Sequence, residues 1–401
     1  MCEFSFNPYR KDNPIWPESL YSDLNSPDIT VLHKSLKGYQ PTPLITLPAL
    51  ARKLGVAQIY VKDESSRFGI KAFKALGASY AIYRFLKAKW EQKFNTEFTP
   101  EAFLDKEKMK LLGKWTFCAA SDGNHGKAVA WTAKMLDQNA VIYMPEDTVE
   151  ARIKNIEMEG AKVVIVNGTY DDCVTQIAND AKENNWVVIS DTAYDGYTEI
   201  PKYIMAGYTG VFRELDGIIN MPDKTEIDFV FMQTGVGGFT GAGMWYYSNK
   251  YGNKRPKLIS VEPTQSDCFL ESIRFGNGNI KPTRGNQQSI MAGLNCGVPS
   301  IISWPIIRDA ADLFISITDI YAEMAIRQFY YPVNGDKRII SCESGAAGMA
   351  GFIAMFLDEK LSHARKEINL NDKSRVLIIN TEGDTDPANF KTIVNKGPLY
   401  Y

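Results

Sequence analysis

The sequence predicts an α/β protein of two domains, each an open, mostly parallel sheet flanked by helices. Short apolar, β-branched runs alternate with longer segments of helical period along the 401 residues. This alternation is typical of right-handed βαβ units. The strand-like runs are apolar throughout, as expected where helices cover both faces of a sheet. The length also suits two domains.

The smaller domain is predicted from four strand-like runs between Trp115 and Ile189, which are KWTFCAAS, AVIYMP, KVVIVNG and WVVIS. Helical patterns separate them, namely NHGKAVAWTAKML, TVEARIKNIEMEG and DDCVTQIANDAKEN. The polar stretch DTAYDGYTEIP then leads into a second α/β block. We therefore assign residues 74–195 to a small domain, and residues 1–73 and 196–401 to a large one.

The large domain contains the remaining strand-like runs, QIYVKDES, DFVFMQTG, KLISVEP, LFISIT and RVLIIN. Ligands of open parallel sheets bind beyond the carboxyl ends of the strands. Four strand ends carry unusual loops, which are SDGNHG, SDTAYDGY, TGVGGFTGAG and NTEGDTDP. We expect these four loops to line one cleft between the two domains.

Composition and charge exclude several classes of partner. Hydrophobic residues make up 45%, charged residues 23%, and the net charge is −2, so we expect neither nucleic acid nor a membrane as partner. The start, MCEFSFNPYRKDNP, lacks the pattern of a secretory signal, and we expect a cytoplasmic protein. The six cysteines form no CxxC pair, so no metal site is predicted. Cys268 and Cys296 could pair, but two free thiols are the preferred interpretation.

The glycine loop TGVGGFTGAG stands between a strand and a helical pattern, where backbone N–H groups and the helix dipole can hold a phosphate. A nicotinamide-dinucleotide site is an alternative, since Gly235 and Gly237 begin its fingerprint and Glu262 could bind a ribose. Thr240 replaces the third glycine of that fingerprint. A tight turn without any ligand is the third interpretation.

Eight motifs together resemble a known family, the fold-type II pyridoxal 5′-phosphate enzymes related to tryptophan synthase β and threonine dehydratase. Within it, the chain is most similar to the diaminopropionate ammonia-lyases. The motifs, in family order along nearly the whole chain, are YQPTPL, RFGIKAFKALGAS, SDGNHG, SDTAYDGY, GVGGFTGAG, SIMAGLNCG, ESGAAG and NTEGDTDP.

The resemblance implies pyridoxal 5′-phosphate as cofactor and a large domain that binds it. Lys74 matches the Schiff-base lysine of the family, and a helix start together with burial favours its neutral amine. Asn124 matches the asparagine beside the ring oxygen, and Thr381 stands where a hydroxyl faces the ring nitrogen, although a cap at a strand end is an alternative for Thr381. The phosphate would be cradled by Gly235, Val236, Gly237, Gly238 and Phe239. Lys71 departs from the family pattern, and we interpret it as a solvated or substrate-gating side chain.

The resemblance further implies a carbon–nitrogen lyase that converts 2,3-diaminopropionate by α,β-elimination into pyruvate and two ammonia. Lys74 and Asp122 would act as bases on opposite faces of the cofactor ring, and Asp191 would orient the β-ammonium group or assist the proton transfer. Ser121, Asp122, Gly123 and Asp191 would contact the substrate. Asp122 and Asp191 could instead cap the helices that follow their strands.

Three other functions stay open at this point. The closest is serine or threonine dehydration, or β-replacement, on the same fold. A nicotinamide-dependent dehydrogenase and a non-catalytic amino-acid binder are more distant. The resemblance also implies a small amino acid as substrate and a homodimer as assembly.

Overall fold

The computed structural model describes residues 1–121, 123–146, 148–168 and 170–399. The chain divides into two compact units. The large unit comprises Met1–Pro17, Pro41–Ser66 and Val211–Tyr401, and the small unit comprises Glu18–Gln40 and Arg67–Gly210. The sequence had placed the small domain at 74–195, without the segment Glu18–Gln40. That segment joins the small unit because helix α2 (Asp28–Ser35) packs on α4 (Lys74–Phe94), and His33 Nε2 donates to the Leu76 carbonyl at 3.0 Å.

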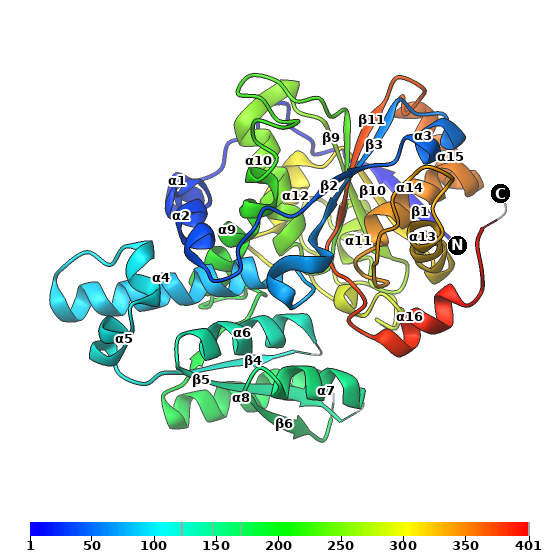
Figure 1. Ribbon diagram of the computed structural model, residues 1–401. Coiled ribbons are helices and arrows are strands. Elements are labelled where there is room, and N and C mark those ends of the chain that lie inside the picture. The colour runs from blue at the N-terminus through cyan, green and yellow to red at the C-terminus, as the bar shows by residue number, and fades with distance from the viewer. Residues whose placement is uncertain (122, 147, 169, 400–401) are drawn as a thin grey trace. The chain divides into compact units, whose positions relative to one another are not determined.

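The large unit contains a seven-stranded, mostly parallel sheet, as predicted (Figure 1). Its strands, in spatial order, are β1 (Glu3–Phe6), β10 (Leu313–Ile317), β9 (Lys257–Pro263), β8 (Phe229–Gln233), β11 (Arg375–Asn380), β3 (Gln58–Asp63) and β2 (Leu44–Thr46). The two edge strands β1 and β2 pair antiparallel with their neighbours. The sequence did not predict either edge strand, because both are short and partly exposed.

Helices cover both faces of this sheet. They are α3 (Pro48–Leu54), α10 (Gly238–Tyr251), α11 (Cys268–Phe275), α12 (Trp304–Ala310), α13 (Asp319–Tyr330), α14 (Ala347–Leu357), α15 (Glu359–Glu367) and α16 (Pro387–Val394). Phe231 of β8 faces α14, whereas the next residue, Met232, faces Gly243 of α10. Because successive strand residues point to opposite faces, α10 and α14 lie on opposite sides of the sheet.

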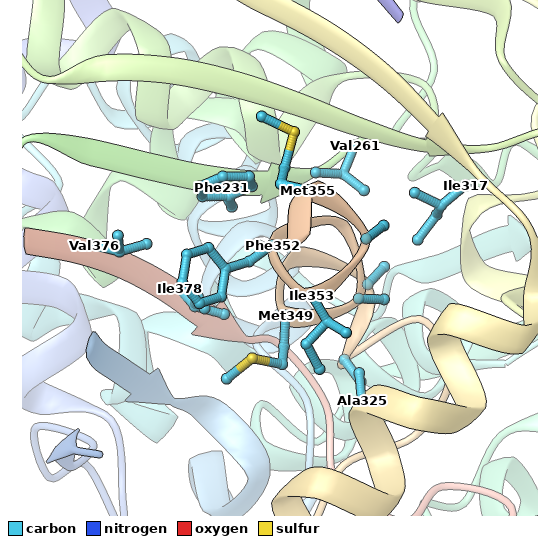
Figure 2. Close-up of a cluster of buried hydrophobic side chains, with 14 of the residues drawn as sticks. Phe231, Val261, Ile317, Ala325, Met349, Phe352, Ile353, Met355, Val376 and Ile378 are labelled. Carbon is cyan, nitrogen blue, oxygen red and sulfur yellow. The ribbon is translucent and has the colours of Figure 1, made fainter. Parts of the chain in front are cut away.

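The core of the large unit forms around α14, whose sequence AGMAGFIAMFL is apolar on every side. A helix of this kind is expected only where other elements surround it. Figure 2 shows its Phe352, Met349 and Ile353 among side chains of the sheet and of α13. These partners include Phe231, Val261, Ile317, Ala325, Val376 and Ile378.

The small unit contains a four-stranded sheet that is parallel throughout the described pairs. Its strands, in spatial order, are β6 (Lys162–Val166), β5 (Asn139–Pro145), β4 (Thr116–Ala120) and β7 (Val187–Val188). All four were predicted. The helices are α1 (Glu18–Tyr21), α2, α4, α5 (Lys106–Leu112), α6 (Asn124–Met135), α7 (Glu150–Glu157), α8 (Tyr170–Asn184) and α9 (Glu199–Arg213), which ends in the large unit.

Parallel pairing sets which loops meet within each unit. In the large unit β8 pairs with β11, and in the small unit β4 pairs with β7. The carboxyl ends of parallel neighbours lie at one edge of a sheet. The glycine loop therefore lies beside the NTEGDTDP loop, and SDGNHG beside SDTAYDGY. Within the described ranges, no helix combines the length and apolar character needed to cross a bilayer.

Candidate active site

Lys74 is the first residue of α4, and a sharply turned segment precedes it. Phe68, Gly69 and Lys71 all have positive φ, at 50°, 74° and 65°. For residues other than glycine this conformation is uncommon and indicates local constraint. The turns end at Phe73, so the Lys74 side chain starts at the amino-terminal end of a 21-residue helix.

The beginning of α4 packs very closely against α9, which explains the glycine of the Leu-Gly-Ala-Ser run. A Cβ atom added at Gly77 would lie 2.4 Å from Tyr208 Cε1, and one added at Gly207 would lie 2.3 Å from the Leu76 carbonyl oxygen. The Tyr208 ring in turn packs on Phe73, with centroids 4.7 Å apart, and lies 5.9 Å from Lys74 Nζ. Glycines on both helices thus fix the position of Lys74.

Lys74 and Asp191 form an ion pair, with Nζ 2.7 Å from Oδ2. Asp191 follows β7, and both side chains are largely buried, with 18% and 16% exposed. Burial acts to raise the pKa of the Asp191 carboxyl, but the Lys74 ammonium outweighs it and holds that pKa well below its usual range. A base would need a raised pKa, so this ion pair holds Asp191 as an ionised partner of Lys74.

His125 also lies close to the Asp191 carboxylate. Its Nε2 donates to the Ile189 carbonyl at 2.6 Å, since a carbonyl oxygen can only accept. Its Nδ1 lies 3.9 Å from Asp191 Oδ2 and is buried with no hydrogen-bond partner among the described residues. Burial, opposed by Asp191, lowers the pKa of His125, which keeps the ring neutral.

The SDGNHG loop is held by its first serine. Ser121 Oγ accepts hydrogen bonds from the amides of Gly123 at 3.1 Å and Gly126 at 2.9 Å. Asn124, the predicted partner of the ring oxygen, is the first residue of α6. Asp122, the predicted second base, lies outside the described residues.

The glycine loop of the large unit needs its glycines for both conformation and space. Gly237 has φ +94°, and a Cβ atom there would lie 2.5 Å from Phe269 Cζ. A Cβ atom at Gly235 would lie 3.2 Å from Cys296 Sγ. Thr240 closes the loop by donating to the Gln233 carbonyl at 2.8 Å. Neither Cys296 nor Cys268 is part of a disulfide, as preferred from the sequence.

The structure also places Glu262 and Thr381, two residues weighed from the sequence. Glu262 is fully buried, and its two carboxyl oxygens accept from the amides of Phe269 and Leu270 at 2.8 and 2.9 Å. It therefore caps α11 and does not face a nucleotide ribose. Thr381 follows β11, is 1% exposed, and accepts a hydrogen bond from Gln233 Nε2 at 2.9 Å.

Similarity to known proteins shows the family of this chain. Residues 36–382 match the family model described as pyridoxal-phosphate dependent enzyme. The chain belongs to this family. It is 39% identical over 367 residues to the diaminopropionate ammonia-lyase of Escherichia coli K12, covering 91% of this chain and 90% of that one.

Solved structures of the E. coli diaminopropionate ammonia-lyase also match. The holo enzyme superposes with a TM-score of 0.86 at 35% identity, covering 99% of this chain and 97% of that chain. Its complex with an aminoacrylate–PLP azomethine reaction intermediate gives the same values, a TM-score of 0.86 and 35% identity. The predicted fold class and family are thereby confirmed, and the nicotinamide alternative is wrong, as the capping role of Glu262 also indicates.

The residues present fit the family's cofactor in each unit separately. The small unit offers a primary amine, Lys74, at a fixed helix start. The large unit offers a glycine loop at the start of α10, where a side chain at Gly235 or Gly237 would press against Cys296 or Phe269. A group of three or more side chains suited to a metal ion is not found in the parts of the chain that the structure describes.

The structure brings together some predicted site residues and adds others. It joins Lys74 with Asp191 in the small unit, and the glycine loop with Thr381 in the large unit. His125, interpreted from the sequence as structural, and Gln233, not singled out at all, contact these groups directly. The sequence feature that could have identified Gln233 is a polar amide at the end of an apolar strand, directly before a glycine loop.

Proposed function

We propose that this chain catalyses the α,β-elimination of 2,3-diaminopropionate to pyruvate and two ammonia. The observation that carries the proposal is the 2.7 Å ion pair of Lys74 and Asp191, a carboxylate set beside a positive charge. The E. coli relative at 39% identity bears the name diaminopropionate ammonia-lyase. The hydroxyl groups of serine and threonine are uncharged, so neither amino acid offers a second positive charge to this carboxylate.

The cofactor would be held by the residues that match the family's motifs. Lys74 would bond to the aldehyde carbon, Asn124 would donate to the ring oxygen, and Thr381 would face the ring nitrogen. Gly235, Val236, Gly237, Gly238 and Phe239 would hold the phosphate at the start of α10, where helix N–H groups point outward. When bound, pyridoxal 5′-phosphate supplies an electron-withdrawing ring that stabilises negative charge at the substrate Cα.

Asp191 would select the substrate by charge. The Asp191 carboxylate is balanced by the Lys74 ammonium. With Lys74 holding the cofactor, that positive charge would no longer be fixed beside Asp191. The β-ammonium of diaminopropionate can replace it, whereas the hydroxyl of serine or threonine leaves the carboxylate without a counter-charge.

Lys74 would remove the substrate Cα proton from its own side of the cofactor ring. Asp122 would act from the opposite side, and this assignment depends on the motif alone. Ser121 and Gly123 would contact the substrate carboxylate. The hydrogen bonds from Gly123 and Gly126 to Ser121 Oγ support this role, because they preshape the loop before substrate arrives.

The decisive experiment measures pyruvate and ammonia released from D- and L-diaminopropionate, serine and threonine side by side. We expect diaminopropionate to be preferred, and a borohydride-reduced cofactor adduct at Lys74 by peptide mass mapping. Lys74→Ala should lose both the adduct and the activity. Equal turnover of serine and diaminopropionate would exclude the proposed substrate, and an adduct without turnover would favour a non-catalytic binder.

Asp191→Asn tests the selection by charge. We expect kcat/KM for diaminopropionate to fall about 10- to 100-fold, the equivalent of a charged hydrogen bond worth about 1.5–3 kcal/mol. Any trace activity on serine should fall less. Asp195→Asn is the matched control, because Asp195 is exposed in the same loop. An equal loss on both substrates would count against a role in selection.

We further propose a homodimer and a cytoplasmic location, which the family resemblance supports. Light scattering of the purified holoenzyme tests the assembly: a mass near twice 45.0 kDa is expected. A monomeric mass at micromolar concentration would contradict the dimer.

A further inference from the structure

Gln233 ends β8 immediately before the glycine loop, and its side chain is almost fully buried at 4% exposure. Its Nε2 lies within hydrogen-bond distance of four oxygens, all in the large unit. These are the carbonyls of Ser344 at 3.4 Å, Gly345 at 3.0 Å and Ile379 at 3.0 Å, and Thr381 Oγ1 at 2.9 Å.

This environment fixes the orientation of the amide. Three of the four oxygens are backbone carbonyls, which accept hydrogen bonds and never donate. A flipped amide would set its own oxygen against all three. The amide nitrogen must therefore be the atom beside Thr381, and an amide N–H₂ group does not accept a proton from a hydroxyl.

The direction of the Thr381 hydroxyl follows. Its proton cannot point at Gln233, and among the described residues no oxygen accepts it. At 1% exposure the side chain is also withdrawn from solvent. A buried hydroxyl donor without an acceptor is costly, by about 1–3 kcal/mol, so the site calls for an acceptor on a ligand.

We propose that Gln233 is a positioning residue which fixes Thr381 as a hydrogen-bond donor, and so holds the ring nitrogen of the cofactor in its unprotonated, accepting form. This inference rests on the proposed function, which sets Thr381 against that nitrogen. A protonated ring nitrogen would need an acceptor, and Thr381 would then have to turn its proton towards the amide of Gln233.

The opposite end of the amide shows that Gln233 is not there for stability alone. Its Oε1 is buried without a hydrogen-bond partner among the described residues. It faces Gly348 at the start of α14, where a Cβ atom would lie 3.2 Å from it. An apolar side chain of similar size would avoid the unfavourable free energy of burying this unsatisfied oxygen. We therefore infer that the amide N–H groups serve the site.

The test is the ¹⁵N resonance of ring-labelled pyridoxal 5′-phosphate bound to the full-length protein. The wild type should show an unprotonated, hydrogen-bonded ring nitrogen. Gln233→Glu supplies a group that accepts from Thr381, so the resonance should shift towards that of a protonated ring. Gln233→Met frees the hydroxyl to rotate and should give a smaller shift, which keeps the inference testable if the glutamate variant does not fold. Gln328→Glu, a buried amide on α13, is the matched control and should give none.

Two outcomes overturn the inference. One is a protonated ring nitrogen in the wild type. The other is an unchanged resonance in both Gln233 variants while Thr381→Val alters it. Failure of the proposed function is distinguishable, because it appears as the absence of a borohydride-reduced adduct at Lys74, whatever the state of the ring nitrogen.

Discussion

Single residues of the small unit determine one another's charge. The charge of the Lys74 ammonium lowers the pKa of Asp191 and so favours its ionised form. Burial keeps His125 neutral although Asp191 Oδ2 lies 3.9 Å from its Nδ1. With His125 neutral, the Lys74 ammonium and the Asp191 carboxylate form a pair with no net charge.

The lowered pKa of His125 has a consequence for stability. In the unfolded chain its pKa is about 6.5, so below that pH the unfolded state binds a proton that the folded state resists. Stability from this group is thus complete above about pH 6.5 and is lost as pH falls towards the lowered folded pKa. We expect the urea midpoint of the wild type to fall between pH 7.5 and 5.5 more than that of His125→Asn. Parallel pH profiles would show that His125 titrates normally.

At the scale of elements, close packing of helices positions Lys74. The contact of α4 with α9 depends on Gly77 and Gly207, where side chains would overlap Tyr208 or the α4 backbone. The RFGIKAFKALGAS motif is thus as much a packing motif as a chemical one. Periodicity predicts α4, but it cannot show that α9, more than 120 residues further on, is its partner.

The sign of the change in the free energy of unfolding caused by Gly77→Ala tests the contact between α4 and α9. In an open helical position this change stabilises a protein by about 1 kcal/mol, because alanine has the higher helix propensity. Here the added Cβ would lie 2.4 Å from Tyr208 Cε1 and 2.8 Å from Ile204 Cγ2. We expect a net loss of about 1–3 kcal/mol in the free energy of unfolding, measured by urea denaturation of the apoprotein. A gain would mean that the two helices are not in contact at this point.

At the scale of the whole molecule, the sequence predicts more of the fold than of the candidate site. Continuous apolar runs identified the central strands, and parallel pairing then explains why loops meet in pairs. The short edge strands and the segment Glu18–Gln40 were missed, because only long-range contacts place them. Lys74 and the glycine loop followed from motifs. Gln233 did not, because its role depends on three carbonyls that come from other strands and loops.

Cofactor binding should stabilise the whole chain, and we expect this stabilisation to require an intact glycine loop. A ligand at 100 times its Kd adds about 2.7 kcal/mol to the folded state. Gly237 and Gly335 share φ +94°, but a Cβ atom at Gly237 would lie 2.5 Å from Phe269, whereas Gly335 has open space. Both alanine variants therefore strain the backbone equally, and only Gly237→Ala displaces the loop. We expect pyridoxal 5′-phosphate to raise the Tm of the wild type and of Gly335→Ala, and to leave that of Gly237→Ala almost unchanged. Equal stabilisation of all three proteins would place the phosphate away from this loop.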